Sequence, residues 1–140
     1  MNFVLDHSVA MRWLLPDPDA ARQTYAMKVL ACMKDASAVA PGLFWLEAAN
    51  VLARAEAQGQ LTVADTTVFV QRLQALPIQE HTRPGPSALQ RSLALARQFG
   101  LSAYDACYLS VALEASAPLA TLDRGLERAA REAGVAFFAA

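Results

Sequence analysis

The sequence is poor in the residues from which disulfide-bonded and zinc-binding proteins are built. It has two cysteines, Cys32 and Cys107, and two histidines, His7 and His81, and these do not form a CxxC or another zinc-type spacing. We therefore expect buried free thiols, as in a cytoplasmic protein. The sequence also lacks a Ser-His-Asp pattern and a Gly-rich phosphate loop, which excludes the common hydrolase and nucleotide-binding motifs.

Long apolar runs and a large net charge are also missing. No apolar run approaches the roughly 18 residues that a membrane-spanning helix needs, so we expect no membrane association. The formal net charge is −1. If four of the 13 acidic residues bound a metal ion, nine would remain against 12 basic residues, so the charge permits RNA binding without indicating it. The hydrophobic fraction of 55% predicts a well-filled core, with apolar surface to spare for an interface.

Short apolar strands alternate with helices along the chain, which predicts an α/β protein. We expect one domain over residues 1–140, built as a three-layer α/β/α sandwich around a central, mostly parallel sheet. Strands are predicted at residues 3–6, 38–41, 77–80, 119–122 and 135–138. Helices are predicted at residues 11–15, 17–34, 43–58, 62–76, 84–99, 102–115 and 124–132. Ser8 is expected to cap the first helix, and Thr62 with Asp65 to form a capping box for the fourth.

Four acidic residues fall where such a sheet binds its ligands, beyond the carboxyl ends of the strands. Asp6 and Asp123 each end a predicted strand, and Asp105 and Glu47 lie near the starts of helices that face the same edge. Two carboxylates about 6 Å apart repel each other by roughly 3 kcal/mol at an effective dielectric constant of 20. Four of them together therefore predict a bound cation, and oxygen ligands alone favour Mg²⁺ or Mn²⁺.

Each acidic residue also has a purely structural interpretation. Asp123 could cap the last helix, Asp105 could form a capping box with Ser102, and Glu47 could lie on a solvated face. Asp6 is harder to explain in this way, because an apolar strand rarely ends in an acid for packing reasons. The shared placement of all four at one edge is what favours a metal site.

Other polar residues lie close to these acids in the sequence. Asn50 and Arg54 follow Glu47 on one predicted helical face, which would allow Asn50 to support the metal site, whereas for Arg54 we expect an ordinary solvated position. His7 directly follows Asp6, and neighbouring residues of a strand point to opposite faces, so we expect it to point away from the site. His81 is expected in a loop, without a chemical role.

The segments that carry these residues resemble the PIN domain, and more narrowly the VapC toxins of bacterial toxin–antitoxin modules. The resemblance rests on FVLDHSVA around Asp6, on P-x5-E-x2-N containing Glu47 and Asn50, on AYDAxYL around Asp105, and on LATLDR around Asp123. These four segments span the whole chain in the same order. Any one alone would be a weak signal, and together they are specific.

The resemblance implies a metal-dependent endoribonuclease, the toxin of a type II toxin–antitoxin system. In such a protein Asp6, Glu47, Asp105 and Asp123 would form the catalytic site and bind Mg²⁺ or Mn²⁺, assisted by the hydroxyls of Ser8 and Thr121. A metal-activated water would hydrolyse phosphodiester bonds of the RNA substrate. A VapB-type antitoxin would hold the enzyme inactive, and the family usually forms homodimers.

Two other functions fit parts of the pattern. A catalytically inactive PIN-like module could bind RNA or a protein, although a binding module has no reason to tolerate four repelling acids. A phosphotransfer domain or a haloacid-dehalogenase-like phosphatase also places acids at strand ends. The latter enzymes need a second Asp where Ser8 stands, and a receiver domain needs a late Lys, whereas the two lysines here are Lys28 and Lys34.

Overall fold

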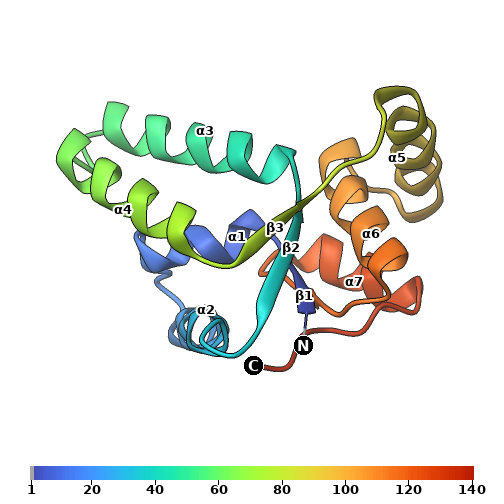
Figure 1. The fold of residues 1–140 in the computed structure, drawn as a ribbon, viewed down its shortest axis with the longest axis horizontal. Helices are drawn as coiled ribbons and strands as arrows, with labels where there is room; N and C mark the ends of the chain where they lie inside the picture. The colour runs from blue at the N-terminus through green and yellow to red at the C-terminus, as the bar shows by residue number, and fades with distance from the viewer. Residues whose placement is uncertain (1) are drawn as a thin grey trace.

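The computed structural model describes residues 2–140, and these form a parallel sheet with helices on both of its faces. The strands are β1 (Asn2–Leu5), β2 (Ser37–Pro41), β3 (Ile78–His81) and β4 (Leu119–Ala120). The helices are α1 (His7–Ala10), the 3-10 turn η1 (Met11–Trp13), α2 (Ala20–Cys32), α3 (Leu43–Ala57), α4 (Val63–Ala75), α5 (Gly85–Phe99), α6 (Ala103–Ala115) and α7 (Arg124–Glu132). Figure 1 shows α1–α4 on one side of the sheet and α5–α7 on the other. The predicted three-layer α/β/α architecture is therefore confirmed.

The strand order β3-β2-β1-β4 places the first strand in the interior of the sheet, paired in parallel with β2 and β4. Helices cover both faces of β1, which explains its unbroken apolar run: Phe3, Val4 and Leu5 are completely buried. The carboxyl ends of β1 and β4 lie side by side, because Val4 pairs with Leu119 and Leu5 pairs with Ala120. The chain adds β2 and β3 on one side of β1 and then adds β4 on its other side, so the strand order reverses between β1 and β4.

The chain turns directly from β1 into α1, which corrects the prediction for this segment. The helix begins at His7 with Asp6 at its N-cap position, so Ser8 lies inside the helix and does not cap a helix starting at Met11. The reason is that β1 stops at Leu5, one residue earlier than predicted. By contrast, the capping box of Thr62 and Asp65 at the start of α4 is confirmed.

The strand predicted at residues 135–138 is wrong, because this segment forms only a single parallel bridge between Leu119 and Phe137. Two backbone hydrogen bonds join it to Leu119, from Leu119 N–H to the Ala136 carbonyl and from Phe138 N–H to the Leu119 carbonyl. β4 itself has only two residues and offers no longer edge for pairing. The segment is instead held by stacking of the Phe138 ring on Phe3, with ring centroids 4.2 Å apart.

Candidate metal centre

Asp6 is the buried centre of the candidate site, with 1% of its surface exposed. Its backbone N–H donates to the Ala120 carbonyl at 3.0 Å, which fixes the end of β1 against β4. Two hydroxyls donate to its Oδ2 atom, from Ser8 at 2.6 Å and from Thr121 at 2.8 Å. The other carboxylate oxygen, Oδ1, lies 3.1 Å from His7 Nδ1. A buried carboxylate with one oxygen held by hydroxyls presents the second oxygen in a fixed direction.

The same two hydroxyls connect the ends of β1 and β4. Ser8 Oγ accepts a hydrogen bond from Leu122 N–H at 3.0 Å, and Thr121 Oγ1 accepts one from Asp123 N–H at 3.0 Å. The two hydroxyl oxygens lie 3.4 Å from each other. Ser8 and Thr121, the two hydroxyls that the sequence singles out, therefore orient Asp6 and hold the loop that carries Asp123.

Asp123 caps α7 and also faces the other acids. Its Oδ1 atom accepts a hydrogen bond from Leu126 N–H at 2.8 Å, so the structural interpretation of this residue holds. The residue is nevertheless exposed and lies close enough to Asp105 for its charge to act on that carboxyl. Arg22 of α2 donates to the Leu122 carbonyl at 2.9 Å and anchors the loop from the opposite side.

Asp105 shows that the acids from distant parts of the sequence converge. The pKa of its carboxyl is raised to about 6. Burial is the largest cause, and the negative charges of Asp123, Asp6 and Glu47 raise the pKa further. Ser102 Oγ accepts a hydrogen bond from Asp105 N–H at 3.1 Å, as expected for an N-cap. Within residues 2–140, however, the Asp105 carboxylate returns no bond to the Ser102 backbone, so the capping box is not completed and the carboxylate faces the other acids.

Glu47, in the second turn of α3, is joined to the cluster by a residue that the sequence alone did not single out. Its Oε1 atom accepts a hydrogen bond from the Tyr108 hydroxyl at 2.8 Å and lies 3.3 Å from His7 Nδ1. Tyr108 is completely buried and fixes the direction of the Glu47 carboxylate. The available signal was its spacing, because Tyr108 follows Asp105 by three residues and so lies on the same face of α6.

His7 lies between two of the acids, which corrects the expectation that it points away. The strand alternation on which that expectation rests does not apply, because His7 is the first residue of α1. Burial on its own lowers the pKa of His7. The hydrogen bonds and negative charges of Asp6 and Glu47 outweigh it and raise this pKa to about 10. One ligand atom each from Asp6, His7 and Glu47 lie within 4.8 Å of one another.

Comparison with known proteins agrees with this fold. The sequence model of the PIN domain matches residues 3–132. The chain belongs to the PIN-domain family. Members of this family are generally nucleases. A comparison with curated protein sequences found no match.

Solved structures with the same fold include proteins from three organisms. PAE2754 from Pyrobaculum aerophilum is 23% identical with a TM-score of 0.64, covering 92% of this chain and 87% of that one. FitAcB from Neisseria gonorrhoeae is 21% identical with a TM-score of 0.61, covering 99% of this chain and 97% of that one. A toxin–antitoxin complex from Klebsiella pneumoniae is 17% identical with a TM-score of 0.58, covering 86% of both chains. At these identities the likeness shows a shared fold.

The side chains of this PIN domain fit a divalent cation. Ligand atoms of Asp6, His7 and Glu47 lie within 4.8 Å of one another, and Asp105 and Asp123 are not part of this group. The pKa of Asp105 is raised first by burial and then by the charges of Asp123, Asp6 and Glu47. Asn50, expected to support the site, is exposed, and no hydrogen bond joins it to the four acids in the described chain. Arg54 is exposed as well, in agreement with a solvated position.

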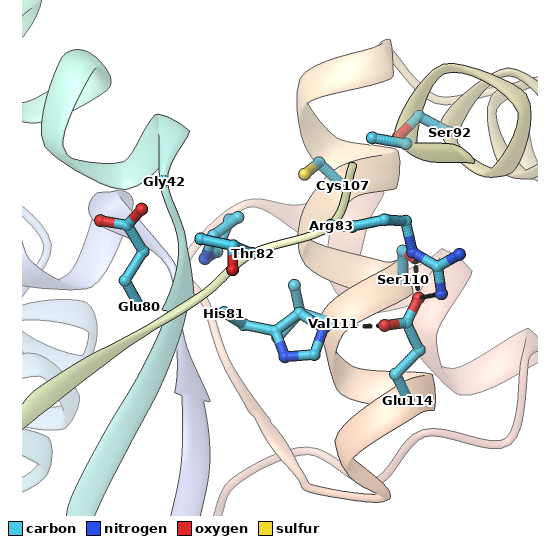
Figure 2. A pocket seen from close by; sticks show the side chains of 12 residues that line it. Gly42, Glu80, His81, Thr82, Arg83, Ser92, Cys107, Ser110, Val111 and Glu114 are labelled. Carbon is cyan, nitrogen blue, oxygen red and sulfur yellow. Dashed lines mark hydrogen bonds and ion pairs between the residues drawn. The ribbon is translucent and has the colours of Figure 1, made fainter. Parts of the chain in front are cut away.

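A pocket separate from the four acids lies beyond the carboxyl ends of β2 and β3 and has a volume of about 200 Å³ (Figure 2). Glu114 of α6 accepts hydrogen bonds there from His81, Arg83 and Ser110. Burial opposes the lowering of its pKa, but these bonds together hold the pKa of Glu114 below its ordinary value. His81 is the last residue of β3, which corrects the expectation of a loop, and its ring contacts Glu114.

No helix in the described part of the chain is long and apolar enough to cross a membrane.

Proposed function

We propose that this PIN domain is a metal-dependent endoribonuclease that hydrolyses phosphodiester bonds of RNA. The observation that carries the proposal is the meeting of Asp6 and Glu47, from two separate segments, beside His7: one ligand atom from each of these three residues lies within 4.8 Å of the others. Burial and then the charges of Asp123, Asp6 and Glu47 raise the pKa of Asp105, which supports a single cluster of the four acids at the carboxyl edge of the sheet. Such a cluster is costly unless a cation neutralises it, and Mg²⁺ or Mn²⁺ suits carboxylate ligands.

The acids of the site would bind metal, and the two hydroxyls would orient Asp6. Asp6 and Asp105 would hold the principal metal ion, and Glu47 and Asp123 would complete its ligands or recruit a second ion. Ser8 and Thr121 keep Asp6 in one orientation through their bonds to Oδ2. These contacts prepare the ligand atoms before the ion arrives, which reduces the reorganisation that binding requires.

A bound divalent ion would lower the pKa of water and stabilise negative charge on the scissile phosphate. Attack by water in line with the leaving oxygen would break the bond between phosphorus and the 3′ oxygen. The products would then carry a 5′-phosphate and a 3′-hydroxyl. The four carboxylates would hold the metal ion near the phosphate. Burial of Asp6 keeps water away from Oδ2, the oxygen that accepts the hydrogen bonds of Ser8 and Thr121.

The test is cleavage of total RNA by the purified protein in Mn²⁺, with the cut ends identified by sequencing. We expect Asp6→Asn and Asp105→Asn to abolish cleavage, since each removes a ligand charge while keeping the shape of the side chain. Asp35→Asn is the matched control, because Asp35 is an exposed acid outside the cluster. Excess chelator should abolish cleavage by the wild type. Full cleavage by either site variant would contradict the assignment.

An inactive PIN-like module that binds RNA or protein is the second candidate. The two differ in metal binding, because an inactive module has no need for the ion. Titration of Mn²⁺ into the metal-free protein, followed by calorimetry, separates them. Saturable binding that Asp105→Asn weakens supports the nuclease, and absence of binding favours the inactive module.

We further propose that the nuclease is the toxin of a type II toxin–antitoxin pair and is held inactive in the cytoplasm by a VapB-type antitoxin. The resemblance to VapC toxins supports this role, as does the shared fold with a toxin–antitoxin complex from Klebsiella pneumoniae. Induced expression in a bacterial host should arrest growth, and Asp105→Asn should relieve the arrest at equal protein level. Normal growth with soluble wild-type protein would count against the toxin role.

A homodimer is the proposed assembly, and apolar side chains on α5 support it. Leu89 and Leu93 lie one turn apart and are 69% and 43% exposed, which is unusual for residues of this type on adjacent turns. Light scattering after gel filtration should give twice the mass of one chain. Leu89→Glu should shift the protein to the mass of a monomer, whereas an unchanged mass would remove α5 from the interface.

A further inference from the structure

His7 lies between Asp6 and Glu47 and contacts both carboxylates. Its Nδ1 atom lies 3.1 Å from Asp6 Oδ1 and 3.3 Å from Glu47 Oε1. Both of these oxygens belong to acids that we propose as metal ligands. The ring is placed by the backbone, because His7 is the first residue of α1 and Asp6 is its N-cap. Nδ1 is therefore directed to the two carboxylates by the same turn that ends β1.

The spacing of these three atoms fits neighbouring positions around one metal ion. With metal–ligand bonds of about 2.1 Å in octahedral geometry, adjacent ligand atoms lie about 3.0 Å apart. The distances from His7 Nδ1 to the two oxygens are close to this value. One ligand atom from each of the three residues lies within 4.8 Å of the others. Opposite ligands of an octahedron lie about 4.2 Å apart, so a small movement of the carboxylates brings all three into one coordination sphere.

The imidazole ring of His7 is partly covered by Tyr108 and partly exposed, so a metal ion can approach it. Tyr108 lies beside it, with ring centroids 6.3 Å apart, and also holds Glu47 through its hydroxyl. The His7 side chain keeps 24% of its surface exposed, so solvent and a metal ion can reach it. Tyr108 thus limits how far both the imidazole and the Glu47 carboxylate can turn.

We propose that His7 Nδ1 releases its proton to solvent when the ion binds and becomes a metal ligand alongside Asp6 and Glu47, and that this nitrogen donor makes the site prefer Mn²⁺ to Mg²⁺. The inference rests on the proposed metal-dependent function and adds the identity of the metal to it. Mg²⁺ selects oxygen ligands, whereas imidazole suits transition-metal ions. Four acids alone do not distinguish strongly between the two ions, so the nitrogen sets the preference.

The first experiment detects the bond between nitrogen and metal directly, without measuring activity. Electron spin-echo envelope modulation of the Mn²⁺-loaded, tag-free protein records nitrogen nuclei that bind the ion. The chain has two histidines, so the His81→Phe variant leaves His7 as the only imidazole. We expect this variant to show a strong ¹⁴N coupling that changes to a ¹⁵N pattern when histidine is labelled with ¹⁵N.

The second experiment uses the affinity for each metal. His7→Phe keeps a ring beside Tyr108 and removes both nitrogens. We expect it to weaken Mn²⁺ binding by about 10- to 100-fold or more, the range seen when metal-site partners are lost. Mg²⁺ binding should change much less, so the ratio of the two affinities falls. His81→Phe is the matched control and should leave both affinities unchanged.

The outcomes separate this inference from the proposed function. If Mn²⁺ binds without a histidine coupling in the His81→Phe protein, His7 is no ligand and the inference is overturned, while the metal-dependent function stands. The inference is also overturned if His7→Phe tightens Mn²⁺ binding, because His7 is then a competing positive charge. If the wild type binds neither Mn²⁺ nor Mg²⁺, the proposed function itself fails. The spectrum of the His81→Phe protein decides the question even if His7→Phe does not fold.

Discussion

Replacement of Thr121 by Val removes one hydroxyl from the interior of the candidate site and nearly preserves the shape of the side chain. Thr121 is 1% exposed, donates to Asp6 Oδ2 at 2.8 Å, and accepts from Asp123 N–H at 3.0 Å. In the variant the buried carboxylate loses one of its two hydroxyl donors. The Asp123 N–H also loses its acceptor, but Asp123 is exposed and water can take that place.

The magnitude follows from the lost bond to a charged group. Hydrogen bonds to ionised partners contribute about 1.5–3 kcal/mol, and the Asp6 carboxylate has almost no access to water as a substitute. We therefore expect a loss of about 2–3 kcal/mol in the free energy of unfolding. An entropy of unfolding near 2.1 cal/mol/K per residue gives about 0.3 kcal/mol/K for 140 residues. The midpoint of thermal unfolding should thus fall by about 7–10 °C.

The assay is thermal unfolding by circular dichroism at pH 7 with excess chelator, so that metal binding does not contribute. Thr66→Val is the matched control, because the Thr66 hydroxyl is buried and has no hydrogen-bond partner in the described structure. That substitution should leave the midpoint unchanged or raise it slightly. A Thr121→Val midpoint as high as that of Thr66→Val would refute the claim that the Thr121 hydroxyl supports Asp6.

Three further variants test other contacts of the site. Ser8→Ala removes the second donor to Asp6, and chemical denaturation should show a loss of about 1–3 kcal/mol. Tyr108→Phe frees Glu47, which is partly exposed, so we expect a loss of about 1–2 kcal/mol and weaker Mn²⁺ binding in calorimetry. The pKa of Asp105 is raised to about 6, above its unfolded value, so its stabilising contribution is complete below the unfolded pKa and is lost as pH rises through about 6. Asp105→Asn should therefore raise the metal-free thermal midpoint at pH 8 more than at pH 5. An equal effect at both pH values would contradict this coupling.

Local signals in the sequence predict much of the fold and part of the site. The apolar run of β1 predicts a strand buried on both faces, and Asp6 directly follows its last residue instead of ending the strand as predicted. The capping residues Thr62 and Ser102 mark the starts of their helices, since their side chains accept hydrogen bonds from the helix backbone. Ser8 and Thr121 are predicted through the resemblance to the PIN domain rather than from local chemistry.

The features that the sequence does not predict depend on exact turns and on contacts between distant segments. His7 is misplaced by assuming a strand for one residue too many, and one residue reverses the direction of a side chain. The bond between Tyr108 and Glu47 joins residues 61 positions apart, and the spacing of Tyr108 from Asp105 indicates a shared helical face but not this partner. Residues 135–138 have the composition of a strand, but β4 is too short to pair with them.

The position of β4 in the sheet has a consequence for how the protein is synthesised. β1 is made first, yet one of its edges stays unpaired until residues 119 and 120 have left the ribosome. A nascent chain that ends before this point contains Asp6 and Glu47 but lacks both Asp123 and the hydroxyl of Thr121. The strand order thus delays assembly of the acidic cluster until residues 119–123 are available, and a chain terminated before them lacks the full set of proposed ligands.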